Sequence, residues 1–294
     1  VTLMPTDQPQ EKLDGADETL PMTVERLAES YRFDSEMARL LTQLQYQADG
    51  ITLTAAENRP LPDRAIDAAT PGLATVFESD ASLVFITYDE RSHRMVNPIE
   101  TTLIGALAGA VRTDDSEETV PDGGTVGSYK EEQTNRATTE DPGPLEFGVV
   151  TPHNAQRGAL ETALPASVTA NTVEKYQGGE RDVMAVSATV SDPEFARREE
   201  QFLLDPRRLL VAISRARLQT IIVCSTALFE VAPIDSDRLD DGPVWAGLFT
   251  QAVGRQAEPA WRGSLGEFIQ QPAVAHATVP VAVYPSTISN HDTQ

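Results

Sequence analysis

The chain has 294 residues, of which 45 are acidic and 23 are basic, so its formal net charge is −22 and its isoelectric point lies near 4.4. This length fits one large domain or two small ones, and 40 % apolar residues suffice for a core, which excludes disorder over the whole chain. No apolar run approaches the roughly 18 residues of a membrane helix, and the start lacks a signal-peptide pattern. We therefore expect a soluble, cytoplasmic protein.

Arginine has nearly displaced lysine, which occurs only at positions 12, 130 and 175. Strong acidity with scarce lysine predicts a protein from an extreme halophile, because ~1 M salt shortens the Debye length to about 3 Å and screens self-repulsion. Net negative charge then says little about a nucleic-acid partner, and local charge must be judged instead. The single cysteine, Cys224, excludes disulfides and cysteine-cluster zinc sites, and its apolar surroundings predict a buried position.

Short apolar runs alternate with helical patterns along most of the chain. This alternation predicts an α/β fold with a parallel sheet covered by helices on both faces and with ligands beyond the carboxyl ends of the strands. Helices are expected at 35–46, 98–111, 154–164 and 206–215, and strands at 83–86, 147–150, 168–172, 183–189 and 220–225.

Composition divides the chain further. Residues 112–144 are rich in Asp, Glu, Thr and Gly and nearly lack large apolar side chains, so they cannot offset their ordering entropy by burial. The expected parts are an irregular N-terminus at 1–20, the first part of the α/β domain at 21–111, an acidic flexible insertion at 112–144, the core of the domain at 145–232, and a helix near 244–253 with a mostly disordered tail within 233–294.

Residues 171–182 join two expected strands and place titratable and amide side chains around two glycines. Gly178 and Gly179 permit backbone conformations that other residues resist, so the chain can approach a ligand while Gln177 and Glu180 present polar groups. We expect this segment at the carboxyl end of a strand. An ordinary polar hairpin would have the same composition.

Residues 205–217 form a locally basic segment. Leu209, Ala212, Ile213 and Ala216 have helical spacing and predict a core face, while Arg208 and Arg215 would share a flank of the same helix. Planar guanidinium groups suit phosphate oxygens, so an arginine here could neutralise charge on a transferred phosphoryl group. A solvated arginine-rich face, paired with the abundant carboxylates, is the alternative.

Tyr31 and Arg32 stand together just before the first expected helix. An aromatic ring next to an arginine can stack on a base and hold a phosphate, although this dipeptide alone is weak evidence.

Together these segments resemble the C-terminal, second RecA-like domain of superfamily 1 DNA and RNA helicases of the nonsense-mediated-decay and senataxin-like group. The resemblance spans residues 27–229 and rests on the order of several motifs. Residues 29–46 are similar to motif IV, Asn97 and Glu100 to an Asn-x-x-Glu helix start, 148–156 to the following strand and helix, 171–182 to motif V, and 207–217 to motif VI.

The resemblance implies a RecA-like sheet of the P-loop NTPase superfamily, with ATP and Mg²⁺ as cofactors and single-stranded DNA or RNA as partner. It assigns a role to each matching residue. Tyr31 would stack on the adenine or its ribose side, Arg32 and Arg215 would reach the γ-phosphate, Glu180 would accept from the ribose hydroxyls, Gln177 and Gly179 would shape that pocket, and Thr151, Asn154 and Thr172 would touch the nucleic-acid backbone.

A motor of this class also needs a phosphate-binding loop, Gly-x-x-x-x-Gly-Lys-Ser/Thr, and this sequence contains none. None of its three lysines follows a glycine. The resemblance places the family's first lobe before Val1, so we expect ATP and Mg²⁺ to be used only with a separate P-loop lobe, and no ATPase activity from this chain alone.

Two other hypotheses remain open. One is a non-enzymatic nucleic-acid-binding or interaction module derived from a helicase. The other is an unrelated doubly wound enzyme using Asp89, Glu90 and His153, although these residues have neither metal-ligand spacing nor a nucleophile motif behind them.

Overall fold

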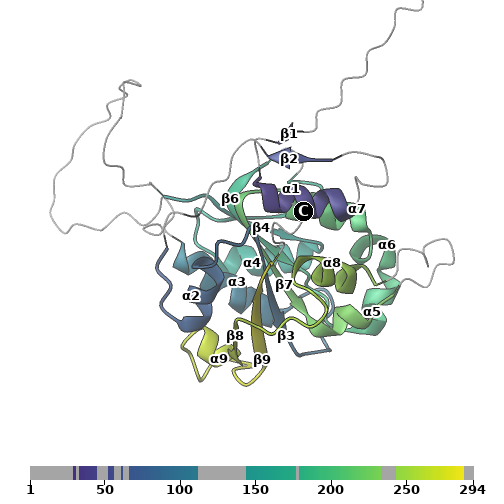
Figure 1. Cartoon of the computed structure of the whole chain (residues 1–294). Helices are drawn as coiled ribbons and strands as arrows, with labels where there is room; N and C mark the ends of the chain where they lie inside the picture. The colour runs from purple at the N-terminus through teal and green to yellow at the C-terminus, as the bar shows by residue number, and fades with distance from the viewer. Residues whose placement is uncertain are drawn as a thin grey trace, which may run out of the picture.

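The computed structural model describes residues 29–30, 33–44, 52–55, 61, 66–111, 144–176, 179–232 and 243–287, and a seven-stranded sheet lies at its centre (Figure 1). The strand order is β5-β4-β6-β7-β3-β9-β8. The first five strands in this order are parallel, while β9 runs antiparallel to both β3 and β8. The bounds are β3 Leu83–Tyr88, β4 Phe147–Thr151, β5 Thr169–Thr172, β6 Arg181–Ser187, β7 Ala216–Ser225, β8 Trp261–Ser264 and β9 Pro280–Pro285.

Helices cover both faces of this sheet (Figure 1), as expected from the continuous apolar runs of its central strands. Alternate side chains of β3 enter different cores, with Val84 and Ile86 on one face and Leu83 and Phe85 on the other. The first face carries α2 (Pro71–Phe77), α3 (Pro98–Ala110), α4 (Asn154–Ala163) and α9 (Leu265–Phe268), and the second carries α1 (Ser35–Leu44), α5 (Pro193–Arg198), α6 (Glu200–Leu203), α7 (Pro206–Ile213) and α8 (Val244–Ala252). The predicted α/β class is thus confirmed, with a mixed rather than wholly parallel sheet.

Smaller elements complete the fold. The two-residue strands β1 (Glu29–Ser30) and β2 (Thr54–Ala55) pair in parallel away from the main sheet, and a 3-10 helix, η3 (Thr226–Glu230), follows β7. Cys224 is fully buried on β7, as its apolar surroundings predicted.

The predicted helix over 206–215 is too long by two residues. α7 ends at Ile213, Ser214 and Arg215 form a turn, and Ala216 begins β7 because it pairs with Arg181 of β6. Ala216 is buried, but in a strand instead of on a helix face. The proposed shared flank of Arg208 and Arg215 is therefore wrong.

The prediction of a mostly disordered tail is wrong for residues 261–287. Here β9 joins the sheet beside β3, with Val281 and Val283 buried. β8 pairs with β9 and is the outermost strand on that side. This pairing joins residues almost 200 positions apart, so local composition gives little sign of it. The expected irregular N-terminus at 1–20 and nearly all of the acidic insertion at 112–144 lie outside the described residues.

Chain connections change direction between β4 and β6. From β4 the chain passes through α4 to the outer strand β5, whereas from β6 it passes through α5, α6 and α7 to β7 on the other side. In open α/β sheets such a reversal leaves a crevice at the carboxyl ends of the two strands. Within the part of the chain that the structure describes, no helix has the length and apolar character needed to cross a bilayer.

Candidate functional site at two edges of the sheet

The strand ends define two sides of the sheet. We call the side at which the five parallel strands begin the amino edge and the side at which they end the carboxyl edge; neither term refers to an edge strand. At the amino edge, Arg181 of β6 pairs with Ala216 of β7, and the Arg181 amide donates to the carbonyl of Arg215 over 3.2 Å. Arg215 Nε donates to the carbonyl of Val211 in α7 over 3.1 Å, which orients the guanidinium. Glu180 directly precedes Arg181, so Glu180 and Arg215 lie side by side, each partly buried.

The expectation that residues 171–182 lie at a carboxyl end holds only for their beginning. Since β5 and β6 are parallel, the chain must return across the sheet from Thr172 to Arg181 before β6 can start. Tyr176 packs on the sheet during this crossing, and its hydroxyl donates to the carbonyl of Thr169 over 2.9 Å. Glu180 consequently lies at the opposite edge from the one predicted.

Two glycines make room for this crossing segment. A Cβ on Gly148 would lie 2.5 Å from the Tyr176 hydroxyl and 2.7 Å from Arg181 Cγ, and a Cβ on Gly179 would lie 3.2 Å from the Tyr176 ring. Gly179 does not have a positive φ, so close packing against Tyr176, not an unusual backbone conformation, favours glycine there.

Ion pairs surround this amino edge. Arg217 donates to Asp182 over 2.9 Å and also to Glu146, so its guanidinium links β7 with the starts of β6 and β4. Burial lowers the pKa of Arg217, but the hydrogen bonds and charges of Asp182 and Glu146 outweigh burial and raise this pKa above its ordinary value. Arg208 pairs with Glu174, so the alternative of a carboxylate-paired arginine face describes Arg208 correctly.

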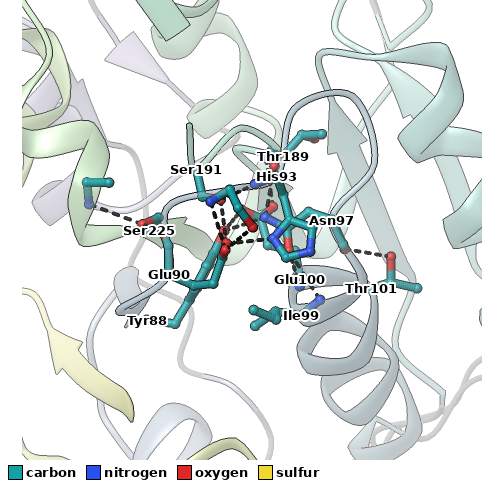
Figure 2. Close-up of polar contacts among 12 residues, drawn as sticks. Tyr88, Glu90, His93, Asn97, Ile99, Glu100, Thr101, Thr189, Ser191 and Ser225 are labelled. Atoms are coloured by element: carbon teal, nitrogen blue, oxygen red, sulfur yellow. Dashed lines mark hydrogen bonds and ion pairs between the residues drawn. The ribbon is translucent and has the colours of Figure 1, made fainter. Parts of the chain in front are cut away.

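A buried polar network lies at the carboxyl edge (Figure 2). The fully buried Glu100 carboxylate accepts from the Tyr88 hydroxyl over 2.7 Å, from the Thr189 amide over 2.8 Å and from the Ser187 hydroxyl. Burial raises the pKa of Glu100 to about 7 against the opposing effect of these three hydrogen bonds. Burial and the nearby Glu100 carboxylate likewise raise the pKa of Tyr88.

Asn97 ties this network to α3 and α4. Its side-chain amide donates to the Tyr88 hydroxyl and to the Thr189 carbonyl, at 2.6 and 2.8 Å, while its own backbone amide donates to Gln156 Oε1 over 2.8 Å. Thr189 has a φ of 66°, which is strained for a β-branched residue. The Thr189 hydroxyl also bonds to that of Thr151 over 2.9 Å. The network therefore holds a strained turn at the crevice between β4 and β6.

Glu90 and His153, two residues of the doubly wound enzyme hypothesis, have different surroundings. Glu90 bonds to His93 and Ser191 (Figure 2) and also to Ser92. Burial raises the pKa of Glu90, but these hydrogen bonds outweigh burial and lower it to about 2. Burial lowers the pKa of His153, which packs against Phe195 with ring centres 6.3 Å apart. Among the described residues, no three His, Cys, Asp or Glu side chains are grouped so that they could hold a metal ion.

Comparison with known proteins decides the family. The family model AAA_12, described as an AAA domain, matches residues 10–227, which is well over half of the chain. The chain belongs to this family. It is 25 % identical over 227 residues to the DNA replication ATP-dependent helicase/nuclease JHS1 of Arabidopsis thaliana, covering 74 % of this chain and 15 % of that protein. It is 26 % identical to the DNA polymerase alpha-associated DNA helicase A of Saccharomyces cerevisiae, covering 66 % of this chain and 26 % of that protein.

A Drosophila melanogaster homolog of the regulator of nonsense transcripts 1 is 34 % identical over 90 residues, covering 27 % of this chain and 7 % of that protein. The resemblance to superfamily 1 helicases is thereby confirmed, and the chain spans about a quarter or less of the length of these relatives. A crystal structure of PRRSV nsp10, a helicase, shares 15 % identity with a TM-score of 0.27 and covers 67 % of this chain and 23 % of that chain. That TM-score is too low to bear on the fold, which follows from the strand order.

Within this AAA_12 chain, the three residues expected to touch nucleic acid differ in exposure. Asn154 is exposed at the start of α4, whereas Thr172 is buried at the end of β5 with 6 % exposure. Thr151 is fully buried at the end of β4, and its hydroxyl bonds to that of Thr189.

Of the residues expected around the nucleotide, Tyr31, Arg32 and Gln177 lie outside the described residues. The structure does bring Glu180, Gly179 and Arg215 to one edge. The Glu100 network was missed by the sequence analysis. Its Asn-x-x-Glu pattern was noticed only as a helix start, because its partners on β3 and after β6 are distant in sequence.

Proposed function

We propose that this chain is the C-terminal RecA-like lobe of an ATP-dependent superfamily 1 helicase, which provides an arginine finger, ribose contacts and nucleic-acid backbone contacts. One observation supports this most: parallel pairing of Arg181 with Ala216 sets Glu180 and Arg215 beside each other at the amino edge. They come from segments similar to two different helicase motifs. If residues 171–182 were only an ordinary polar hairpin, there would be no functional reason for Glu180 to lie beside Arg215.

At the amino edge, the donor chemistry fits a nucleotide. Arg215 has a planar guanidinium oriented by the Val211 carbonyl, and it would stabilise negative charge on a transferred phosphoryl group. Glu180 would accept hydrogen bonds from ribose hydroxyls. In this proposal Arg32 is a second cation at the γ-phosphate, Tyr31 stacks beside the adenine, and the pocket is shaped by Gln177 and Gly179.

At the carboxyl edge, Asn154 and Thr172 would contact the backbone of single-stranded DNA or RNA. Asn154 is exposed at the start of α4, and the first amides of a helix have no partner within the helix, so they can donate to phosphate oxygens. Such contacts carry no sequence information, which suits a motor that must move along any strand. Thr151 acts in this proposal through the buried network that shapes the edge.

The sequence holds no phosphate-binding loop, so the proposal assigns the phosphate cradle and the Mg²⁺ site to a separate P-loop lobe. Hydrolysis of ATP between the two lobes would supply the free energy for translocation, and Mg²⁺ would neutralise charge on the phosphates. Arg215 would then act across the lobe interface, and this chain alone would not turn over ATP.

The test is single-strand-stimulated ATPase activity in molar KCl, measured for this chain alone and mixed with a helicase lobe that carries a P-loop. We expect turnover only in the mixture, and Arg215→Ala should reduce it by about 10³-fold. Arg262→Ala, an exposed arginine on β8, is the matched control and should leave it unchanged. Turnover by the isolated chain would refute the proposal. Nucleic-acid binding without activity in any mixture would favour the non-enzymatic binding module.

A further inference from the structure

Met95 and Val96 are the exposed large hydrophobic residues in the described part of the chain, with 51 % and 43 % of their surfaces accessible. They are adjacent in sequence and lie in the segment that joins β3 to α3 at the carboxyl edge. Single apolar residues scattered over a surface are normal. Two adjacent exposed apolar residues at a candidate binding edge are unusual and indicate a possible contact with a ligand.

The backbone around this pair is fixed from both sides. On one side, the amides of Ser191 and Asp192 both donate to the His93 carbonyl, over 2.9 and 3.0 Å, and the His93 amide donates to the Ser191 hydroxyl over 2.9 Å. On the other side, Asn97 is bound to Gln156 of α4. Met95 and Val96 therefore project from a pinned segment, which lowers the conformational cost of using them in binding.

Arg94 connects this pair to the nucleic-acid edge already described. Its guanidinium carbon lies 6.0 Å from the centre of the Phe195 ring, its Nε donates to Asp192 over 2.8 Å, and 62 % of its side chain remains exposed. Phe195 also packs against His153, the residue before Asn154. Arg94 and Phe195 thus link the segment that carries Met95 and Val96 to the start of α4.

We propose that Met95 and Val96 contact the faces of nucleobases in single-stranded DNA or RNA, while Arg94 contacts a neighbouring phosphate. This inference rests on the proposed function. This surface suits a single strand of nucleic acid better than a folded protein. Stable protein interfaces need roughly 800 Å² on each partner, whereas two side chains offer only enough apolar surface for one or two bases. Every nucleobase has a planar face, so contacts with these faces allow the chain to bind nucleic acid of any sequence.

The experiment measures fluorescence anisotropy of the chain in molar KCl with two labelled probes of equal length, oligothymidine and an abasic oligonucleotide. The double variant Met95→Ser with Val96→Ser should weaken oligothymidine binding by about 5-fold or more and change abasic binding by less than about 2-fold. The conservative double variant Met95→Leu with Val96→Ile should bind oligothymidine as tightly as the unsubstituted chain. Arg94→Ala should weaken both probes, and Arg262→Ala neither.

Equal loss on both probes, or no loss, in the double serine variant would overturn the base contact. If Asn154→Ala weakens binding while the double serine variant does not, the inference fails and the proposed nucleic-acid edge stands. If the unsubstituted chain binds neither probe, the nucleic-acid part of the proposed function fails together with it. Circular dichroism should show unchanged folding in each variant, because the substituted side chains are exposed.

Discussion

The two edges of the sheet use polar side chains in opposite ways. At the carboxyl edge, Glu100 and its partners are buried and bond to one another, so they shape the surface without reaching it. At the amino edge, charged groups such as Arg217 and Asp182 pair while partly exposed, beside Glu180 and Arg215. A buried network gives rigidity, whereas charges in reach of solvent can also meet a ligand.

The largest expected effect of a substitution is at the buried network. Glu100→Ala would leave the Tyr88 hydroxyl, the Ser187 hydroxyl and the Thr189 amide without their acceptor, and should lower the free energy of unfolding by about 3 to 4 kcal/mol. Glu100→Gln keeps the shape and one carbonyl acceptor and should cost about half as much. Urea denaturation in molar KCl measures both. Equal stability of Glu100→Ala and the unsubstituted chain would show that the network is not needed for folding.

The same carboxyl group predicts a pH dependence. Its pKa is raised from the ordinary 4.5 to about 7, so between these values the folded state holds a proton that the unfolded state has lost. Stability should be fully present below about pH 4.5 and should fall as the pH rises to about 7, by up to about 3 kcal/mol. Glu100→Gln should flatten this part of the profile. Glu90 has the opposite effect, because its pKa is lowered to about 2. Its contribution to the stability of the folded state is present above about pH 4.5 and is lost as the pH falls from 4.5 to 2.

A smaller effect tests the crossing segment that carries Glu180 to the amino edge. Gly148→Ala would place a Cβ 2.5 Å from the Tyr176 hydroxyl, so we expect a loss of about 1 to 3 kcal/mol in unfolding free energy. Gly105→Ala in α3 meets no atom within 4 Å and should instead stabilise the chain by about 0.5 to 1 kcal/mol. If both substitutions have the same effect on the thermal midpoint, Tyr176 does not pack as described.

The smallest effect concerns the ion pairs of the amino edge. Arg217→Met removes the link from β7 to Asp182 and Glu146, and should cost about 1 kcal/mol because the group is partly screened by solvent. Arg91→Met, which breaks the exposed pair with Glu230, is the matched control and should change the urea midpoint hardly at all. A larger loss for the Arg91 variant would reverse this ranking.

The sequence predicted the elements whose signals are local. The apolar run of β3, the proline at the first turn of α3 and the basic segment of α7 each mark their element within a few residues. It did not predict that β9 joins β3, nor that Glu100 meets Ser187 and Thr189, because these contacts depend on pairing between distant segments. The position of Glu180 was misjudged for a related reason, since the return between two parallel strands cannot be seen in composition. Origin from a halophile stays a prediction.

A crystal structure of this chain bound to a P-loop lobe and a non-hydrolysable ATP analogue would show directly whether Glu180 and Arg215 face the nucleotide. We expect the guanidinium of Arg215 to lie within hydrogen-bond distance of the γ-phosphate and Glu180 to lie at the ribose. A nucleotide bound at the carboxyl edge, away from both side chains, would contradict this expectation.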